Sequence, residues 1–371
     1  MNLGNVFANR IEWIQWYEYT GVYGGSFWII IVNGLLFSIF KNIHRKQVRP
    51  IIYTSSYGIA ILVLPFLFSY YLFSKEIPND NKLSIAVLQP NIDSYHEKFD
   101  GLSDMQQSKK IVTQLINSQN SVDIYLLPET AIPKNFNIGK KPYPASIDYL
   151  LSWSKAKESS IIGGFYTHDS VNYNSALYIK NGEILGSRNK IKLLAFAESI
   201  PFEFIGKWIG KYIEQKGGIS QSFGRDKKAK PFQISTHTSV GTLICFESVF
   251  PDIAAEIIRN NAQFLLIITN DDWWGNSAGY RQHFAFAKLR AIENRRAIAR
   301  SANTGISGFI NAKGETIKIS TYKTAAVLSN TIFSPNKVSF FSIYEPTIRY
   351  LLIAISVTLF AISRIIRQAK D

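Results

Sequence analysis

The only cysteine of the sequence, Cys245, follows an apolar run in the segment LICFE. A cysteine thiolate is a strong nucleophile, but it needs a base that accepts the thiol proton and a donor that stabilises an oxyanion. Glu129, in LLPE, could be that base once partial burial raises its pKa. Lys190, in RNKIK, could hold the carboxylate and then stabilise the oxyanion. A Glu–Lys–Cys set therefore contains the groups that acyl transfer requires, without a histidine.

Each of these three residues also has an ordinary explanation. A single cysteine at the end of a strand is usually a small buried hydrophobe. A glutamate after Leu-Pro is usually a cap or a surface turn, and a lysine two residues after Arg188 usually belongs to a solvated basic face. Their occurrence in one chain, each beside the end of an apolar run, favours the interpretation as a site.

Between residues 79 and 345, short apolar runs alternate with helical patterns. The runs predict strands at 83–89, 123–129, 160–166, 175–180, 240–247, 264–270 and 305–311. The patterns predict helices at 104–118, 145–157, 249–260 and 280–298. This alternation indicates an α/β fold with a mixed sheet, whose strands are buried on both faces. Functional side chains gather at the carboxyl ends of such strands, where Glu129, Cys245 and the segment 270–274 lie.

Three longer apolar stretches, at 21–40, 51–73 and 348–366, are long enough to cross a membrane. The alternative is that they are buried core helices, but each is nearly free of charge over its length. The chain then divides into an N-terminal membrane region (1–78), a globular domain (79–345), and a last transmembrane helix with its tail (346–371).

Positive charge predicts the orientation of these helices. Basic residues lie between the first two stretches and after the third: Lys41, Arg45, Lys46, Arg49, Arg364, Arg367 and Lys370. Both segments should be cytoplasmic, so the globular domain should face the other side, which in a bacterium is the periplasm. We find no cleavable signal peptide, and we expect the first stretch to direct the chain to the inner membrane.

The composition excludes several classes of protein. Aromatic residues make up 14% of the 371 residues, which excludes a disordered chain. One cysteine excludes a disulfide scaffold and argues against a cysteine-based zinc or iron–sulfur site. The net charge of +14 suits anionic lipid head groups better than nucleic acid, given the three apolar stretches. The five histidines show no ligand spacing, so we expect no metal and no cofactor.

Four segments resemble the signature blocks of the nitrilase, or carbon–nitrogen hydrolase, superfamily: LPET at 127–130, NKIKLLAFAESIPF at 189–202, LICFESVFPD at 243–252 and ITNDDWWGNSAG at 268–279. With the membrane stretches, they are similar to the membrane-bound apolipoprotein N-acyltransferase family. The resemblance implies a nitrilase-like α-β-β-α sandwich flanked by two transmembrane helices before it and one after it. That family carries further spans upstream, so we expect this chain to lack the family's first transmembrane helices.

The resemblance also implies roles for residues of this sequence. Glu129 matches the family's general base, Lys190 its catalytic lysine and Cys245 its nucleophile. Two further glutamates of the family's site match Glu198 and Glu247. The residues that match substrate-binding aromatics are Phe99, Phe246, Trp273 and Trp274. Phe99 stands where the family tends to have tryptophan, and Phe246 where it often has tyrosine. The two tryptophans could equally be core or interfacial aromatics.

The resemblance implies acyl transfer in two steps. A fatty acyl group passes from a phospholipid to the cysteine as a thioester, and then to the N-terminal amine of diacylglyceryl-cysteine in an apolipoprotein. The implied partners are phospholipid, apolipoprotein and membrane lipids, with the chain as a monomer and no nucleic acid. Two alternatives remain open: a membrane-tethered amidase or nitrilase that acts on a small amide, and a truncated, non-catalytic copy that binds lipid or lipoprotein.

One further segment, 203–218, has the pattern of a basic amphipathic helix. Its apolar stripe predicts a membrane-interface gate formed by Phe204, Trp208, Ile209 and Tyr212. The alternative is an ordinary surface helix that packs on the domain.

Overall fold

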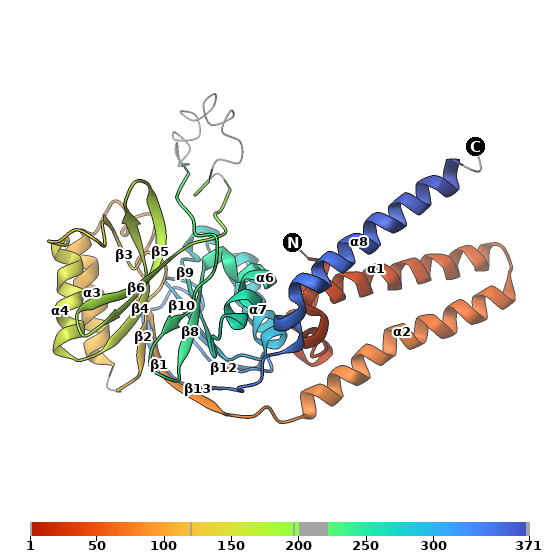
Figure 1. The fold of residues 1–371 in the computed structure, drawn as a ribbon, viewed down its shortest axis with the longest axis horizontal. Helices are drawn as coiled ribbons and strands as arrows, with labels where there is room; N and C mark the ends of the chain where they lie inside the picture. The colour runs from red at the N-terminus through yellow and green to blue at the C-terminus, as the bar shows by residue number, and fades with distance from the viewer. Residues whose placement is uncertain (1, 119–120, 196, 200–221, 369–371) are drawn as a thin grey trace.

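Two β-sheets packed face to face form the centre of the globular domain (Figure 1). The computed structural model describes residues 2–118, 121–195, 197–199 and 222–368. One sheet has the order β13-β1-β2-β4-β5-β6, with β3 paired to β4. Its strands are β1 (Asn81–Gln89), β2 (Ile124–Leu126), β3 (Ile132–Phe136), β4 (Ser160–His168), β5 (Asn172–Lys180), β6 (Glu183–Asn189) and β13 (Ala326–Ser334).

The second sheet has the order β12-β11-β10-β9-β8-β7. Its strands are β7 (Phe232–Gln233), β8 (Ser239–Ile244), β9 (Phe264–Thr269), β10 (Ile298–Ala302), β11 (Gly308–Ile310) and β12 (Thr316–Ile319). β8, β9 and β10 run parallel, as do β1, β2 and β4 in the first sheet. Every residue of β8, β9 and β10 is buried, as expected for parallel strands that are covered on both faces.

Helices cover the outer face of each sheet. The first sheet packs against α3 (Asp104–Asn117) and α4 (Ala145–Ala156), and the second against α6 (Pro251–Arg259) and α7 (Ala278–Asn294). Local sequence starts two of these helices: Ser103 and Gln106 form a capping box before α3, and Pro251 occupies the first turn of α6. The result is the α-β-β-α sandwich that we expected.

Three long apolar helices extend away from the domain (Figure 1). They are α1 (Tyr17–His44), α2 (Val48–Ser74) and α8 (Phe340–Gln368), each long and apolar enough to cross a membrane. They coincide with the three predicted stretches but are longer at both ends. Two short 3-10 helices, η1 (Leu3–Phe7) and η2 (Ile11–Trp13), precede α1.

A backbone kink fastens α1 to the domain. Gly21 has φ 61°, and a side chain at this position would collide with the ring of Phe341. The kink leaves the backbone N–H of Val22 free to donate a hydrogen bond of 2.8 Å to Glu293 of α7. A polar contact between α1 and the domain thus depends on a single glycine.

Some predicted boundaries are wrong. The strand predicted at 240–247 ends at Ile244, and Cys245 begins a short 3-10 helix, η3 (Cys245–Val249). The helix predicted at 280–298 ends at Asn294, where Arg295 takes a left-handed conformation, and β10 follows. β13 was not predicted because most of its residues are half-buried and polar residues interrupt its apolar pattern.

Candidate active site

The candidate catalytic side chains meet where strands of the two sheets end. Glu129 follows β2 and Lys190 follows β6, so both belong to the first sheet. Cys245 directly follows β8 of the second sheet. The fold therefore brings together three residues that are far apart in the sequence, at the sheet edge where we expected them.

A compact hydrogen-bond network surrounds Lys190. Its ammonium group donates to Glu129 Oε1 at 3.1 Å and to Glu198 Oε1 at 2.8 Å. Asn174 of β5 bridges the same two carboxylates with its amide group, at 2.8 Å to each. The second oxygen of Glu129 accepts the backbone N–H of Asn270 at 3.1 Å.

This network keeps Glu129 ionised. Burial would raise the pKa of Glu129, but the Lys190 ammonium and the hydrogen bonds from Asn174 and Lys190 outweigh burial and hold the pKa below its ordinary value. Burial would lower the pKa of Lys190, but the carboxylates of Glu129 and Glu198 raise it well above the ordinary value. The resting pair is therefore carboxylate and ammonium.

Cys245 lies on a tight turn directly after β8. Its φ is 51°, a left-handed conformation that non-glycine residues rarely adopt, and its side chain is half-buried. The Cys245 thiol lies near enough to the Glu129 carboxylate to help lower the pKa of Glu129. Removal from water and the nearby charge of Glu129 raise the pKa of the thiol, so it rests as S–H beside a carboxylate that could accept its proton.

A second buried network supports the Cys245 backbone. His283 of α7 hydrogen-bonds the Cys245 carbonyl oxygen at 3.1 Å through Nε2, and Asp271 at 2.9 Å through Nδ1. Arg300 of β10 donates to the other oxygen of Asp271 at 2.6 Å. His283 thereby supports the backbone of the turn at Cys245, and it is a positioning residue.

Glu247 also acts on backbone and not on the thiol. It is fully buried and forms an ion pair of 2.7 Å with Arg188 of β6. Its carboxylate accepts the backbone N–H groups of Ile191 and Ile244, which adjoin Lys190 and Cys245. Glu247 thus holds the lysine and the cysteine segments in register, and Arg188 belongs to the site and not to a solvated face.

An exposed aromatic cluster lies beside these networks. Phe99 stacks on Trp273 with ring centroids 6.0 Å apart, and Tyr95 meets the same indole edge-on at 5.5 Å. The loop that carries Phe99 is fastened to the end of β9, since the backbone N–H of Ser94 donates to Asp272 at 2.6 Å. This cluster adjoins the site through Lys98, the neighbour of Phe99, which donates to the Glu129 carbonyl oxygen.

The other predicted aromatics take different positions. Trp274, in the 3-10 helix η4 (Asp272–Trp274), meets the His283 ring edge-on at 5.1 Å. Phe246 packs edge-on against Phe250 at 5.3 Å. The predicted gate residues Phe204, Trp208, Ile209 and Tyr212 lie outside the described residues.

Four residues of the site were missed by sequence reasoning: Asn174, Arg188, His283 and Lys98. Lys98 is buried and donates to the Glu129 carbonyl oxygen at 3.2 Å, and burial lowers its pKa to about 8. Arg188 carried a weak signal, because it lies two residues before Lys190 on a strand and so shares its face. The other three reach the site through contacts with segments distant in sequence, which no local pattern reveals.

Comparison with known proteins agrees with this architecture. The chain is 27% identical to the apolipoprotein N-acyltransferase of Chlorobaculum tepidum and 28% identical to that of Geobacter metallireducens. These alignments cover 96% and 95% of the chain, which spans 71% and 67% of the two relatives.

The fold also matches a solved structure of similar architecture. The carbon-nitrogen hydrolase from Helicobacter pylori G27 superposes with a TM-score of 0.51 at 13% identity, over 74% of this chain and 94% of that one. The family profile for carbon-nitrogen hydrolases matches residues 84–334, which include Glu129, Lys190 and Cys245. The chain therefore belongs to the carbon-nitrogen hydrolase family.

Proposed function

We propose that the chain is an apolipoprotein N-acyltransferase, which moves a fatty acyl group from a phospholipid to the N-terminal amine of diacylglyceryl-cysteine in a lipoprotein. The observation that carries the proposal is the buried ion pair of 3.1 Å between Glu129 and Lys190, at the strand ends where Cys245 directly follows β8. The names of the relatives and the three apolar helices support a substrate that arrives within a membrane.

In the first step, the Cys245 sulfur attacks the carbonyl carbon of a phospholipid ester while Glu129 takes the thiol proton. The carbonyl oxygen of the ester becomes an oxyanion, and the Lys190 ammonium stabilises it. When the tetrahedral intermediate collapses, the C–O bond breaks and Glu129 returns the proton to the departing lysophospholipid oxygen. The product is an acyl-thioester on Cys245, and Glu129 is again a carboxylate.

In the second step, the α-amine of the acceptor attacks the thioester carbonyl. Glu129 accepts a proton from the amine, Lys190 again stabilises the oxyanion, and the C–S bond breaks. The Cys245 thiolate regains the proton from Glu129, and an amide leaves with the lipoprotein. Exclusion of water from the site protects the thioester between the two steps.

The remaining site residues receive roles within this proposal. Glu198 orients Lys190 through their 2.8 Å contact, and Glu247 positions the Lys190 and Cys245 segments. Phe99 and Trp273 offer their exposed faces to an acyl chain, and Phe246 and Trp274 are the further aromatics that we assign to substrate binding. The segment with Phe204, Trp208, Ile209 and Tyr212 remains the proposed gate at the membrane interface.

The proposed setting is the bacterial inner membrane, with the domain (79–345) on the periplasmic side as a monomer. The basic residues that should be cytoplasmic support this orientation. The segment between α1 and α2 and the end of α8, which carries Arg364 and Arg367, lie remote from the domain (Figure 1). The N-terminal region (1–78) and the C-terminal segment (346–371) would then hold the domain at the membrane surface.

The intact mass of the purified chain after incubation with phospholipid vesicles tests the first step. We expect one added fatty acyl group that maps to Cys245 and is removed by hydroxylamine. Cys245→Ala should fold normally, because the change is small, and should show no adduct. Addition of a diacylglyceryl-cysteine peptide should then transfer the group to the peptide amine.

Other results would redirect the assignment. Acylation that persists in Cys245→Ala would show that the proposed mechanism is wrong. Release of free fatty acid in place of the acylated peptide, together with hydrolysis of a small amide, would favour a membrane-tethered amidase. An unreactive chain with an accessible thiol would favour the non-catalytic copy.

A further inference from the structure

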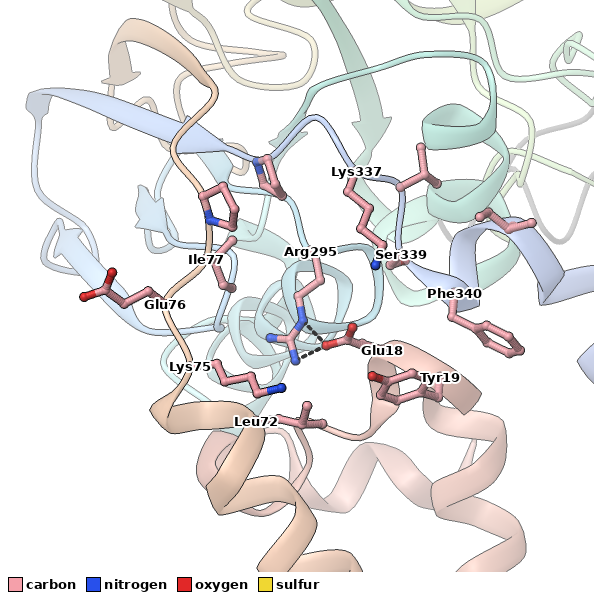
Figure 2. Close-up of a pocket in the computed structure, with 14 residues that line it drawn as sticks. Glu18, Tyr19, Leu72, Lys75, Glu76, Ile77, Arg295, Lys337, Ser339 and Phe340 are labelled. Atoms are coloured by element: carbon pink, nitrogen blue, oxygen red, sulfur yellow. Dashed lines mark hydrogen bonds and ion pairs between the residues drawn. The ribbon is translucent and has the colours of Figure 1, made fainter.

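A cavity of about 440 Å³ lies where the three apolar helices join the domain (Figure 2). Cys245 is not among the residues that line it. Its lining comes from the start of α1, the end of α2 and its following link, and the segment that leads from β13 into α8. It shares no lining residue with the candidate active site. Its volume falls in the range of small-molecule sites, about 300–1,000 Å³.

The position of the cavity along the helices defines its depth. α1 begins at Tyr17, α2 ends at Ser74 and α8 begins at Phe340, so all three helices leave the domain around the cavity. If these helices cross a bilayer, their domain-side ends lie in the head-group layer. The cavity is thus at the depth of lipid head groups.

The charges in the cavity favour an anion. Glu18 is held by the Arg295 guanidinium, which also donates to Gln15, so this pair neutralises itself. Lys75 and Lys337 flank the pair, and Figure 2 shows both side chains directed toward it. Among the described residues, no carboxylate lies within ion-pair distance of either ammonium group.

Glu76 is the remaining acidic residue of the lining, and its carboxylate points away from Lys75 and Lys337 (Figure 2). Tyr71 holds Lys75 in place, since its ring lies 4.3 Å from the Lys75 ammonium group. Among the described residues, the acidic group that acts on Lys75 is Glu18, which Arg295 already pairs. Two lysines that form no ion pair of their own, at head-group depth, suit the phosphate of a lipid.

An apolar groove continues from this cavity along the membrane helices. The groove, of about 390 Å³, lies between α1 and α2 and is lined by Trp16, Thr20, Leu64, Pro65 and Phe68. Tyr19 belongs to the lining of both cavities, so the two adjoin. A charged cavity at head-group depth that opens into an apolar groove matches the two parts of a phospholipid.

We propose that this junction binds one anionic glycerophospholipid, with its phosphate between Lys75 and Lys337 and one acyl chain in the groove between α1 and α2. The lipid would be a bound, non-reacting component that fixes the membrane helices against the domain. The inference rests on the three helices lying in a bilayer and is independent of the proposed acyl transfer.

Photo-crosslinking of the full chain in uncharged detergent micelles tests this site. The probe is a diether phosphatidylglycerol with a diazirine in its head group, which has no ester that Cys245 could attack. At a low mole fraction of probe, we expect crosslinks within residues 72–78 and 335–343. The double variant Lys75→Ser/Lys337→Ser should lose these crosslinks by about 30-fold, since each lysine near a membrane surface contributes roughly a fivefold gain in affinity for anionic lipid.

Matched variants separate the site from general charge. Lys109→Ser/Lys157→Ser removes two exposed lysines from the far side of the domain, near α3 and α4, and should leave the crosslinks unchanged (Figure 1). Lys75→Arg/Lys337→Arg should retain most of them. Equal crosslinking in the two serine variants would overturn the proposal. So would full displacement of the probe by millimolar inorganic phosphate, which would identify a free-anion site.

Discussion

Glu129 is the proposed general base of the site. It accepts hydrogen bonds from Lys190, Asn174 and the Asn270 backbone, and all of them favour its ionised form. The thiol beside it is held protonated. Because the pKa of Glu129 is lowered and the pKa of the Cys245 thiol is raised, the resting site contains little thiolate. We therefore expect the Cys245 thiol to react only when an ester carbonyl is bound that can accept the developing negative charge.

The Asn174→Ala variant tests how Glu129 is kept ionised. Loss of the amide removes one hydrogen bond that lowers the pKa of Glu129, so this pKa should rise toward its ordinary value. Because the base works only when ionised, the acidic limb of the kcat/KM profile should move to higher pH. The value of kcat/KM should also fall by about 10- to 100-fold, as for a lost hydrogen bond to a charged group.

The matched control for this variant is Asn172→Ala, on the same strand. Asn172 is exposed and accepts a hydrogen bond from Asn135, without contact to either carboxylate. The acidic limb of the kcat/KM profile of Asn172→Ala should coincide with that of the wild-type protein. An unshifted limb in Asn174→Ala would mean that the amide serves only to pack β5.

At the scale of elements, backbone contacts position the loop after β2 that carries Glu129. The loop after β2 lies against β4, where Gly164 donates to the Pro128 carbonyl at 3.0 Å and accepts from Ala131 at 2.8 Å. Glu129 lies between these two hydrogen bonds. A Cβ atom at Gly164 would lie 2.6 Å from Glu129 Cα, closer than real Cβ contacts.

Gly164→Ala should therefore displace Glu129 without removing any catalytic group. We expect kcat to fall about 100-fold, the scale of a displacement of 1 Å in an active site. Gly139→Ala, in an exposed loop with only the Asn137 side chain nearby, should leave kcat unchanged. A variant at Gly164 with full activity would show that β4 can move to accommodate the methyl group.

Asp271 connects β9, α7 and β10 through His283 and Arg300. Burial would raise its pKa, but Arg300 and His283 outweigh burial and lower the pKa to about 2. The pKa in the unfolded chain is near 3.8, so this carboxylate stabilises the folded state above pH 4. The contribution, about 2 kcal/mol, is lost as the pH falls from about 4 to about 2.

Thermal unfolding followed by circular dichroism tests this link between elements. Asp271→Asn should have a Tm several degrees below the wild-type value at pH 7, and the gap should narrow between pH 4 and pH 2. A gap that stays constant over this range would assign the loss to packing and not to the charge of Asp271.

Sequence patterns predicted the elements that are apolar over several residues, and they predicted Glu129 and Cys245 near strand ends. The strand that precedes Lys190, β6, was not predicted. They failed where an element owes its existence to a distant partner. β13 is held by its pairing with β1, from Asn81 opposite Ser334 to Gln89 opposite Ala326. The buried polar residues that support the site were missed for the same reason. The contact of His283 with Cys245 joins α7 to η3, and no sequence pattern near His283 predicts it.

On the scale of the whole molecule, the helices and the domain form a polarised assembly. The basic segments at the remote helix ends and the site near the domain's strand ends are separated by the length of the apolar helices (Figure 1). If the positive segments are cytoplasmic, the site and the lysines of the lipid cavity are on the opposite side.

Labelling of single cysteines in spheroplasts tests this orientation. In a Cys245→Ala background, Lys109→Cys places a thiol on the domain, and Gln47→Cys places one between α1 and α2 without removing a charge. A membrane-impermeant maleimide should label the first in intact spheroplasts and the second only after lysis. The reverse pattern would place the domain in the cytoplasm.

The pairing of β13 with β1 has a consequence in time. The edge of β1 is made early, and its partner emerges only after almost the whole domain, just before α8. At about 5–20 residues per second, the ribosome leaves this edge open for roughly half a minute. An open edge can pair with other chains. The nascent protein is therefore most vulnerable while α1 and α2 are already available for insertion, and a chaperone that shields residues 81–89 during this interval would raise its yield.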